Sequence, residues 1–180
     1  MVIVLVVSLF FVNSRCAGPW KGQVVDRDTR TPLEGAVVLF VWYKEYSLLM
    51  HVTRDYYDSA ESVTDADGRF KIESRWTLHP YVFYGKPELH VLKSGYGRWQ
   101  FRDYEKYSKN SFEQEKQIRE EWEQLAGKGG VLELPKLKTR KEMLESLERP
   151  LDVPVERMPK YMDAYNRESV RLGLDPIPSK

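Results

Sequence analysis

The chain has 180 residues, enough for one domain of ordinary size with additional elements, because compact domains most often hold about 100 to 150 residues. Its charged residues are balanced, with 28 Lys and Arg against 27 Asp and Glu, and the formal net charge is +1. A general nucleic-acid binder is expected to carry a concentrated basic face that neutralises phosphates, and the sequence has no such run of Lys and Arg. The composition therefore argues against nucleic acid as a partner.

The first segment of the chain is almost entirely apolar. Residues 2–12 read VIVLVVSLFFV, which is too short for a membrane helix of about 20 residues but suits the apolar region of a signal peptide. No Lys or Arg precedes this run, although signal peptides usually carry one there. We expect residues 1–18 to be a signal segment and the protein to be exported to the periplasm or cell envelope; an uncleaved anchor or an internal hydrophobic strand is the alternative.

Cys16 is the only cysteine, so no disulfide can form within the chain. Its place directly after the apolar run leaves two outcomes open. Cleavage near Gly18 would release a soluble exported protein, whereas lipidation of Cys16, as in a bacterial lipoprotein, would tether the protein to a membrane that it does not span. Arg15 stands where lipoproteins usually have a small residue.

Short strands separated by turn residues are expected in the first half of the chain. Residues 21–26 predict a strand, and residues 27–32 predict a turn because Pro32 lacks an amide donor. Residues 36–43 are apolar at successive positions, which is typical of a central strand covered on both sides. The irregular pattern of residues 44–57 indicates a long loop or a ragged strand.

Two glycine turns are expected to shape these strands. Asp65-Ala66-Asp67-Gly68 predicts a hairpin between residues 60–64 and 69–74, because Asp-Gly readily adopts the positive φ values of tight turns. Gly35 is expected to allow a strained turn before the central strand. Asp65 and Asp67 also resemble the opening of a calcium loop, but the later acidic ligands are missing, so we assign these residues structural roles and expect no metal.

The second half of the chain predicts two further strands and three helices. Strands are expected at residues 87–93 and 131–135. Residues 111–126 are rich in charge, and Ile118, Trp122 and Leu125 recur at helical spacing on one face. The sequence of residues 139–142, Thr-Arg-Lys-Glu, has the form of a capping box that begins a helix ending at about residue 148. A last helix is expected at about residues 160–172, where its apolar positions favour packing against another surface.

The segment from residue 20 to residue 135 resembles the carboxypeptidase regulatory-like domain family. The resemblance lies in residues 22–26, 32–38 and 64–70, and in residues 89–91 together with Gly95 and Tyr96. It implies a mainly β protein with a transthyretin-like (prealbumin-like) β-sandwich of about seven strands, usually exported and usually an accessory module without chemistry of its own. Short strands between Gly, Pro and Asp turns also suggest a sandwich on physical grounds.

This interpretation divides the chain into three parts. Residues 1–18 form the signal segment, and residues 19–136 form the β-sandwich domain with a charged helical insertion at about residues 102–127. Residues 137–180 form a C-terminal helical extension that the resemblance does not explain.

The sequence contains no recognisable catalytic constellation. His51, His79 and His90 follow no metal-ligand spacing, and no Gly-x-Ser-x-Gly motif is present. We therefore expect a protein that is not an enzyme and needs no cofactor. The alternative is a small enzyme or metal-binding protein with a site in the aromatic loops around His51 and His79.

Clustered aromatic residues are the feature that favours a binding partner. They are Trp42, Tyr43, Tyr46, Tyr56, Tyr57 and Trp76. If these side chains project from one end of the sandwich, they form a patch that can stack on sugar rings or bury a peptide. The alternative is that they fill the core. The expected function is thus an accessory binding or structural module of the cell envelope, whose partner is an envelope protein or a carbohydrate.

Overall fold

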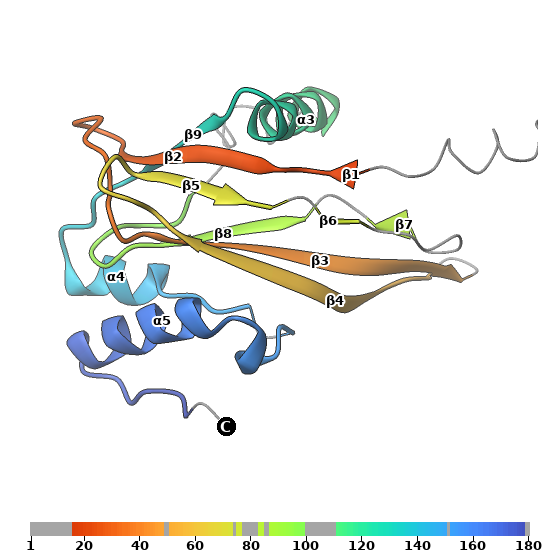
Figure 1. The fold of residues 1–180 in the computed structure, drawn as a ribbon. Coiled ribbons are helices and arrows are strands. Elements are labelled where there is room, and N and C mark those ends of the chain that lie inside the picture. The colour runs from red at the N-terminus through yellow and green to blue at the C-terminus, as the bar shows by residue number, and fades with distance from the viewer. Residues whose placement is uncertain are drawn as a thin grey trace, which may run out of the picture.

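The structure is a computed structural model of the chain. It describes residues 16–48, 51–73, 75–76, 83–84, 87–99, 111–150 and 152–178. The described chain is mainly β: two sheets face each other, one helix lies beside the upper sheet, and the C-terminal helices cover the lower sheet (Figure 1).

Each of the two main sheets is organised around one central strand. The first sheet consists of β5 (Arg69–Ile72), β2 (Trp20–Asp26) and β9 (Gly130–Leu134). The second consists of β4 (His51–Val63), β3 (Val37–Leu48), β7 (Phe83–Tyr84) and β8 (Glu88–Leu92). A separate short pair joins β1 (Cys16–Ala17) to β6 (Arg75–Trp76). All pairs are antiparallel except β2 and β9, which run parallel.

The core between the sheets is built around Phe40. This side chain is fully buried, and its ring contacts those of Trp20 at 5.5 Å, Phe70 at 6.5 Å and Trp122 at 5.5 Å between centroids. Successive side chains of a strand point to opposite faces, so Phe40 and its alternate neighbours on β3 face this core. Residues 37–43 of this strand are buried on both faces, as their apolar sequence predicts.

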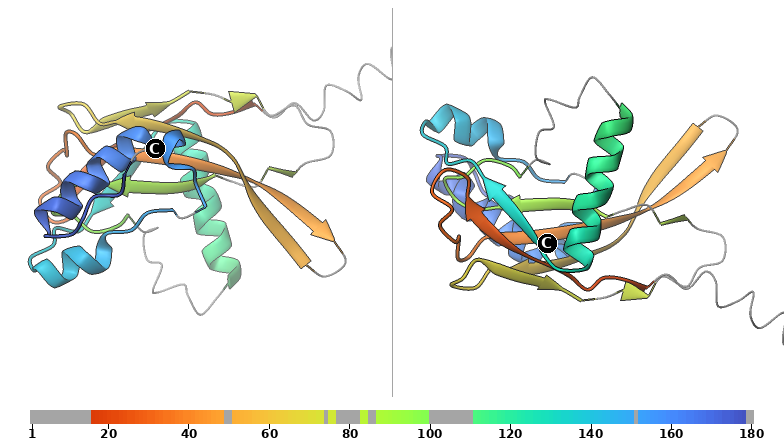
Figure 2. Two further views of the ribbon diagram at one scale, coloured as in Figure 1. Left: turned by 90° about the horizontal axis from the view of Figure 1, so that it is seen from below. Right: turned by 90° about the horizontal axis from the view of Figure 1, so that it is seen from above.

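The other face of β3 packs on the C-terminal helices. These are α4 (Arg140–Ser146), the short 3-10 helix η2 (Val155–Arg157) and α5 (Pro159–Arg171). Leu39 and Val41 of β3 form a second buried cluster with Met158, Tyr161 and Met162. Seen from below, the C-terminal helices lie over the sheet that contains β3 (Figure 2). The capping box of α4 and the position of α5 are confirmed, although α4 ends two residues before the expected residue 148.

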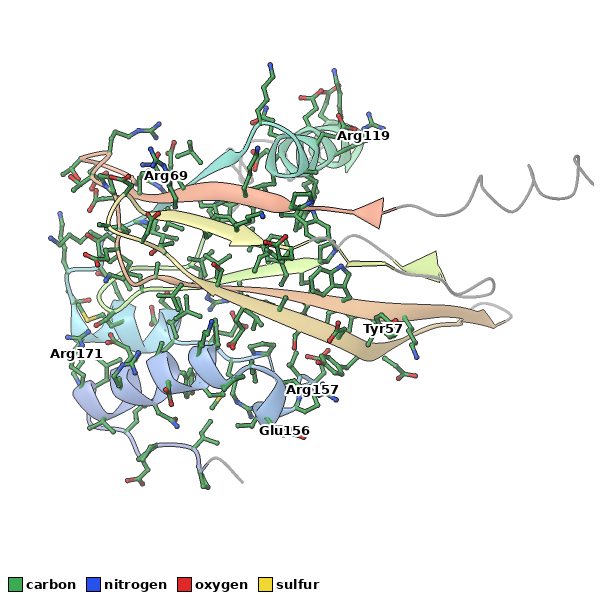
Figure 3. All side chains as sticks on the ribbon, viewed as in Figure 1. Tyr57, Arg69, Arg119, Glu156, Arg157 and Arg171 are labelled. Carbon is green, nitrogen blue, oxygen red and sulfur yellow. The ribbon has the colours of Figure 1, made fainter. Side chains whose placement is uncertain are left out.

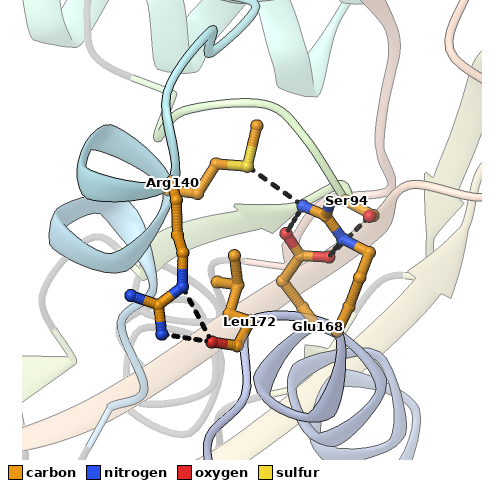
Figure 4. Close-up of polar contacts among 6 residues, drawn as sticks. Ser94, Arg140, Glu168 and Leu172 are labelled. Atoms are coloured by element: carbon orange, nitrogen blue, oxygen red, sulfur yellow. Dashed lines mark hydrogen bonds and ion pairs between the residues drawn. The ribbon is translucent and has the colours of Figure 1, made fainter.

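Polar contacts also fix the far end of α5 to the loop after β8. Glu168 is buried, and its carboxylate accepts hydrogen bonds from the Ser94 hydroxyl at 2.5 Å and from Nε of Arg171 at 2.8 Å (Figure 4). Arg140 of α4 donates two hydrogen bonds to the carbonyl of Leu172, at 2.6 and 3.1 Å. The helical extension is therefore joined to the sheet body by both apolar and polar contacts.

The charged insertion forms a helix where the sequence predicts one. Helix α3 spans Ser111–Ala126, and Trp122 and Leu125 are buried in the core between the sheets while Ile118 packs against it. The next strand comes so close that a Cβ atom at Gly130 would lie 2.8 Å from the Leu125 side chain. Helix α3 therefore closes the core beside β2 and β9.

The turn at Asp65–Gly68 is confirmed, but the expected hairpin is wrong. Oδ1 of Asp65 accepts hydrogen bonds from the amides of Asp67 at 3.0 Å and Arg69 at 2.8 Å, and Gly68 has a φ of +71°. The strands on either side belong to different sheets, because β4 pairs with β3 and β5 pairs with β2. The turn therefore connects the two layers. Gly35 also has a positive φ, +70°, as predicted.

Residues 44–48 and 51–57 are strand, so the ragged strand is the correct one of the two expected alternatives. Strand β3 continues to Leu48 and β4 begins at His51, so the two form a long antiparallel ladder. Trp42 pairs with Asp58, but Tyr43 pairs with Tyr56, which leaves Tyr57 as an extra residue in β4. This bulge is the irregularity that disturbs the alternating pattern of the sequence.

Candidate functional site

A groove of mixed polar and apolar lining lies between β8 and the segment that connects α4 to α5. Its polar and aromatic lining consists of Glu88, His90, Glu148, Arg149, Asp152 and Tyr165, and its apolar lining consists of Leu147, Pro150 and Ile177. A smaller hollow adjoins it at His90, which contributes to both, and is also lined by Arg98, Trp99 and Tyr161. The groove combines carboxylates, a guanidinium, an imidazole and an aromatic ring, which is the type of lining that fixes the orientation of a small polar ligand.

The alternation of β8 places two ionisable residues in this groove. Leu89 and Val91 pack in the core between the sheets, whereas Leu92 packs on the helical side. Because side chains alternate along a strand, Glu88 and His90 share the face of Leu92 and point toward the C-terminal segment. The groove thus follows from the local sequence of β8 and from the helices that cover it.

Glu88 lies between two basic side chains. Its Oε1 is 2.7 Å from Nη1 of Arg54, and its Oε2 is 3.6 Å from Nε2 of His90. The second distance is too long for a hydrogen bond, so His90 attracts the carboxylate as an ion pair when its imidazole is protonated. His90 and, after it, Arg54 lower the pKa of Glu88 to about 2, although partial burial opposes them.

Arg54 also stacks on the ring of Tyr43. The guanidinium carbon lies 3.4 Å from the ring centroid, a cation–π contact that holds Arg54 beside Glu88. Burial raises the pKa of Tyr43, and the negative charge of Glu88 and a hydrogen bond with Asp152 raise it further. The Tyr43 phenol therefore remains protonated at neutral pH.

The imidazole of His90 packs against an aromatic ring of α5. Its ring stands edge-on to Tyr161, with 6.4 Å between centroids, and the Tyr161 hydroxyl donates to the carbonyl of Glu148 at 3.0 Å. Nε2 of His90 is buried and has no hydrogen-bond partner among the described residues. A buried polar atom without a hydrogen bond is costly, and the Glu88 carboxylate, 3.6 Å away, is the charged group that this nitrogen faces.

The expected aromatic patch is wrong for three of its members. Trp42 and Tyr43 are buried on opposite faces of β3, with 3% and 4% of their surface exposed, because adjacent strand residues point in opposite directions. Tyr56 is half-buried against the helical layer and its hydroxyl lies 2.9 Å from Oγ of Ser59. Tyr57 alone among these four is exposed, at the bulge, where Nζ of Lys44 lies 4.9 Å from its ring centroid (Figure 3).

Other predicted site residues are placed only by their backbone or lie outside the described residues. Tyr46, His51 and Trp76 lie in β3, β4 and β6, and the structure does not describe their side chains. His79 lies outside the described residues. Cys16 lies in β1, paired with Trp76, and its lipidation remains a prediction.

Sequence reasoning missed the groove residues. The pattern Glu-x-His at positions 88–90 was a usable signal, since period two places both side chains on one face of a strand. Arg54 and Asp152 carry no comparable signal, because only folding brings them to β8.

Within the described parts of the chain, no three or more His, Cys, Asp and Glu residues come together as a metal site. The helices of these parts also lack the length and apolar character needed to cross a membrane. In comparisons with protein-family models, curated proteins and solved structures, none matches this chain.

Proposed function

We propose that this protein is an exported, non-catalytic binding module of the bacterial cell envelope, and that the groove at β8 is its ligand site. We also propose that its two sheets form a transthyretin-like β-sandwich of about seven strands, as the sequence resemblance implies. The central positions of β2 and β3 and the glycine turns at residues 35 and 68 are consistent with such a sandwich.

The observation that carries this proposal is the mutual pairing of the groove's ionisable groups. Glu88 contacts Arg54 and His90, and its pKa of about 2 keeps it a carboxylate at neutral pH. An efficient general acid or base has a pKa close to the working pH, so Glu88 is poorly suited to proton transfer. A fixed carboxylate beside fixed donors is suited to recognition instead.

The groove favours a ligand rich in hydroxyl groups. Carboxylates of Glu88 and Asp152 accept hydrogen bonds, Arg149 donates them, and the ring of Tyr165 offers an apolar face. Sugars combine hydroxyl groups with apolar ring faces, so a carbohydrate of the envelope is the partner class that matches this lining. A segment of an envelope protein is the second partner class.

Calorimetric titration of the full chain with soluble peptidoglycan fragments tests the proposal. Glu88→Gln is expected to weaken binding roughly tenfold, since a hydrogen bond to a charged group contributes about 1.5 kcal/mol or more. Glu113→Gln, on the exposed face of α3, is the matched control and should leave binding unchanged. Equal affinities of the two variants would refute the groove as the site, and conversion of the fragments to products would favour the alternative of a small enzyme.

Export is tested separately by mass spectrometry of the mature chain from fractionated native cells. A diacylated Cys16 at the N-terminus, or an unmodified chain beginning near Gly18, would support an envelope protein. A cytosolic chain with an intact Met1 would contradict it.

A further inference from the structure

The chain reverses its direction where α5 ends. Leu174 donates its amide to the carbonyl of Ser169 at 2.8 Å, and Gly173, with a φ of +77°, donates its amide to the carbonyl of Val170 at 3.0 Å. These two hydrogen bonds form the Schellman motif, which commonly ends a helix at a glycine. The residues that follow therefore run back beside α5, as the last blue segment of the chain shows (Figure 1).

Residues 175–178, which we call the C-terminal strap, are attached to α5 through one side chain. Nδ2 of Asn166 donates to the carbonyl of Ile177 at 2.8 Å, and Oδ1 of Asn166 accepts the amide of Ile177 at 2.9 Å. Among the residues that the structure describes, the strap makes no other hydrogen bond or ion pair. Asn166 therefore offers the strap one donor and one acceptor, as a neighbouring β-strand would.

The sequence of the strap makes Ile177 its point of attachment. Pro176 and Pro178 have no amide to donate, and a residue that precedes a proline favours an extended backbone. Asp175 and both prolines are exposed, whereas Ile177 is half-buried against the apolar cluster on the helical side of β3. An extended segment held at one residue can detach while the helices stay folded, because few buried contacts are lost.

The attached residue also lines the groove. Ile177 and Tyr165, which directly precedes Asn166 on α5, contribute to the same lining as Glu88 and His90 of β8. Detachment of the strap removes Ile177 from this lining and widens the groove. A ligand that contacts Ile177 gains this contact only while the strap is docked. Binding of the ligand and docking of the strap therefore stabilise each other.

We propose that Asn166 is a positioning residue of the ligand site: it docks the strap as a movable wall of the groove, and the bound ligand holds the strap in place. This inference rests on the proposed function of the groove. It adds one movable wall to a site whose ionisable groups are fixed by their mutual pairing.

Hydrogen exchange of backbone amides, followed by NMR on the full chain, tests whether the strap detaches by itself. The amide of Ile177 should exchange at least roughly a hundredfold faster than the amide of Ser169, a buried residue of α5, because the strap opens without global unfolding. Saturation with soluble peptidoglycan fragments should slow exchange at Ile177 roughly tenfold. Exchange at Leu174, which reports only the end of the helix, should stay unchanged and is the internal control.

Variants at Asn166 test the coupling by calorimetric titration with the same fragments. Asn166→Ala removes both hydrogen bonds and should weaken binding roughly tenfold, since the apparent affinity falls with the fraction of chains whose strap is docked. Asn166→Asp keeps an acceptor for the Ile177 amide but has no donor for its carbonyl, and should weaken binding about threefold. Arg167→Ala, at an exposed neighbouring position, is the matched control and should bind like the wild type. Thermal unfolding of each variant verifies that it is folded.

The outcomes separate the strap from the proposed function. Exchange at Ile177 that is no faster than at Ser169 would overturn the movable strap. Fragments that bind the wild type without slowing exchange at Ile177, or that bind Asn166→Ala equally tightly, would overturn the coupling and leave the groove as the ligand site. Fragments that do not bind the wild type would overturn the proposed function and, with it, the role of Asn166. Slowed exchange at Ile177 together with graded losses of affinity in the two Asn166 variants would confirm the inference.

Discussion

Helix α5 begins without a cap from its own sequence, and Glu61 of β4 replaces it. Oε1 of Glu61 accepts the amide of Tyr161 at 2.7 Å, and Oε2 accepts the amide of Lys160 at 3.0 Å. Pro159 at the first helical position has no amide, and the N-cap residue Met158 makes no side-chain hydrogen bond. The carboxylate therefore satisfies the free donors of the first turn and places a negative charge at the helix N-terminus.

Replacing Glu61 with Ala is expected to lower the free energy of unfolding by about 2 kcal/mol. Loss of a helix cap costs roughly 0.5 to 2 kcal/mol, and hydrogen bonds to a charged group lie at the upper end of the range. Glu61→Gln retains one acceptor oxygen and should lose about half as much. For a chain of this size, 2 kcal/mol corresponds to a fall in Tm of about 4 to 8 °C.

Urea unfolding followed by tryptophan fluorescence measures these differences. Glu156→Ala, on the exposed face of η2, removes a carboxylate near the same helix and should change stability by less than about 0.5 kcal/mol. If Glu61→Ala were no more destabilising than Glu156→Ala, the tertiary cap would not stabilise α5 and the reasoning would be refuted.

Three further changes probe the core, a turn and the groove. Phe40→Ala should cost about 3 to 5 kcal/mol in the same unfolding assay, because the ring is fully buried, and a loss below about 1 kcal/mol would contradict this role. Gly68→Ala should lower the free energy of unfolding more than Gly95→Ala. Both glycines have positive φ, but only at Gly68 would the new Cβ lie 2.5 Å from the Val24 carbonyl oxygen. Equal losses of stability would show that the positive φ accounts for the whole effect. The pKa of Glu88 falls from 4.5 to about 2 on folding, so its stabilising contribution is present above pH 4.5 and is lost as the pH falls toward 2. As the pH is lowered over this range, the urea midpoint of the wild type should therefore fall more steeply than that of Glu88→Gln. Parallel curves would refute this stabilising contribution of Glu88.

Only part of the candidate site could be predicted from the sequence. Glu88 and His90 could have been paired from their spacing, since alternation along a strand is a local property. Arg54 reaches them because the bulge at Tyr57 shifts the register of β4, and Asp152 reaches them because the C-terminal segment folds back over β8. Neither the bulge in β4 nor the path of the C-terminal segment can be predicted from the sequence around Arg54 or Asp152.

The aromatic residues show the same limit. Their clustering in sequence suggested a shared surface, but Trp42 and Tyr43 are neighbours on one strand and face opposite cores. The face of β3 that carries Tyr43 is buried by α5, which is distant in sequence.

The sequence by itself determined the local elements: strand β2, the turns at Gly35 and Gly68, helix α3 with its buried face, and the capping box of α4. These depend on periodicity, turn conformation and capping, which act within a few residues. Only the tertiary structure decided that β5 pairs with β2 instead of β4, that β9 runs parallel to β2, and that the C-terminal helices cover β3. Strand pairing and layer packing depend on which apolar faces can be buried together, and that choice is made by the whole chain at once.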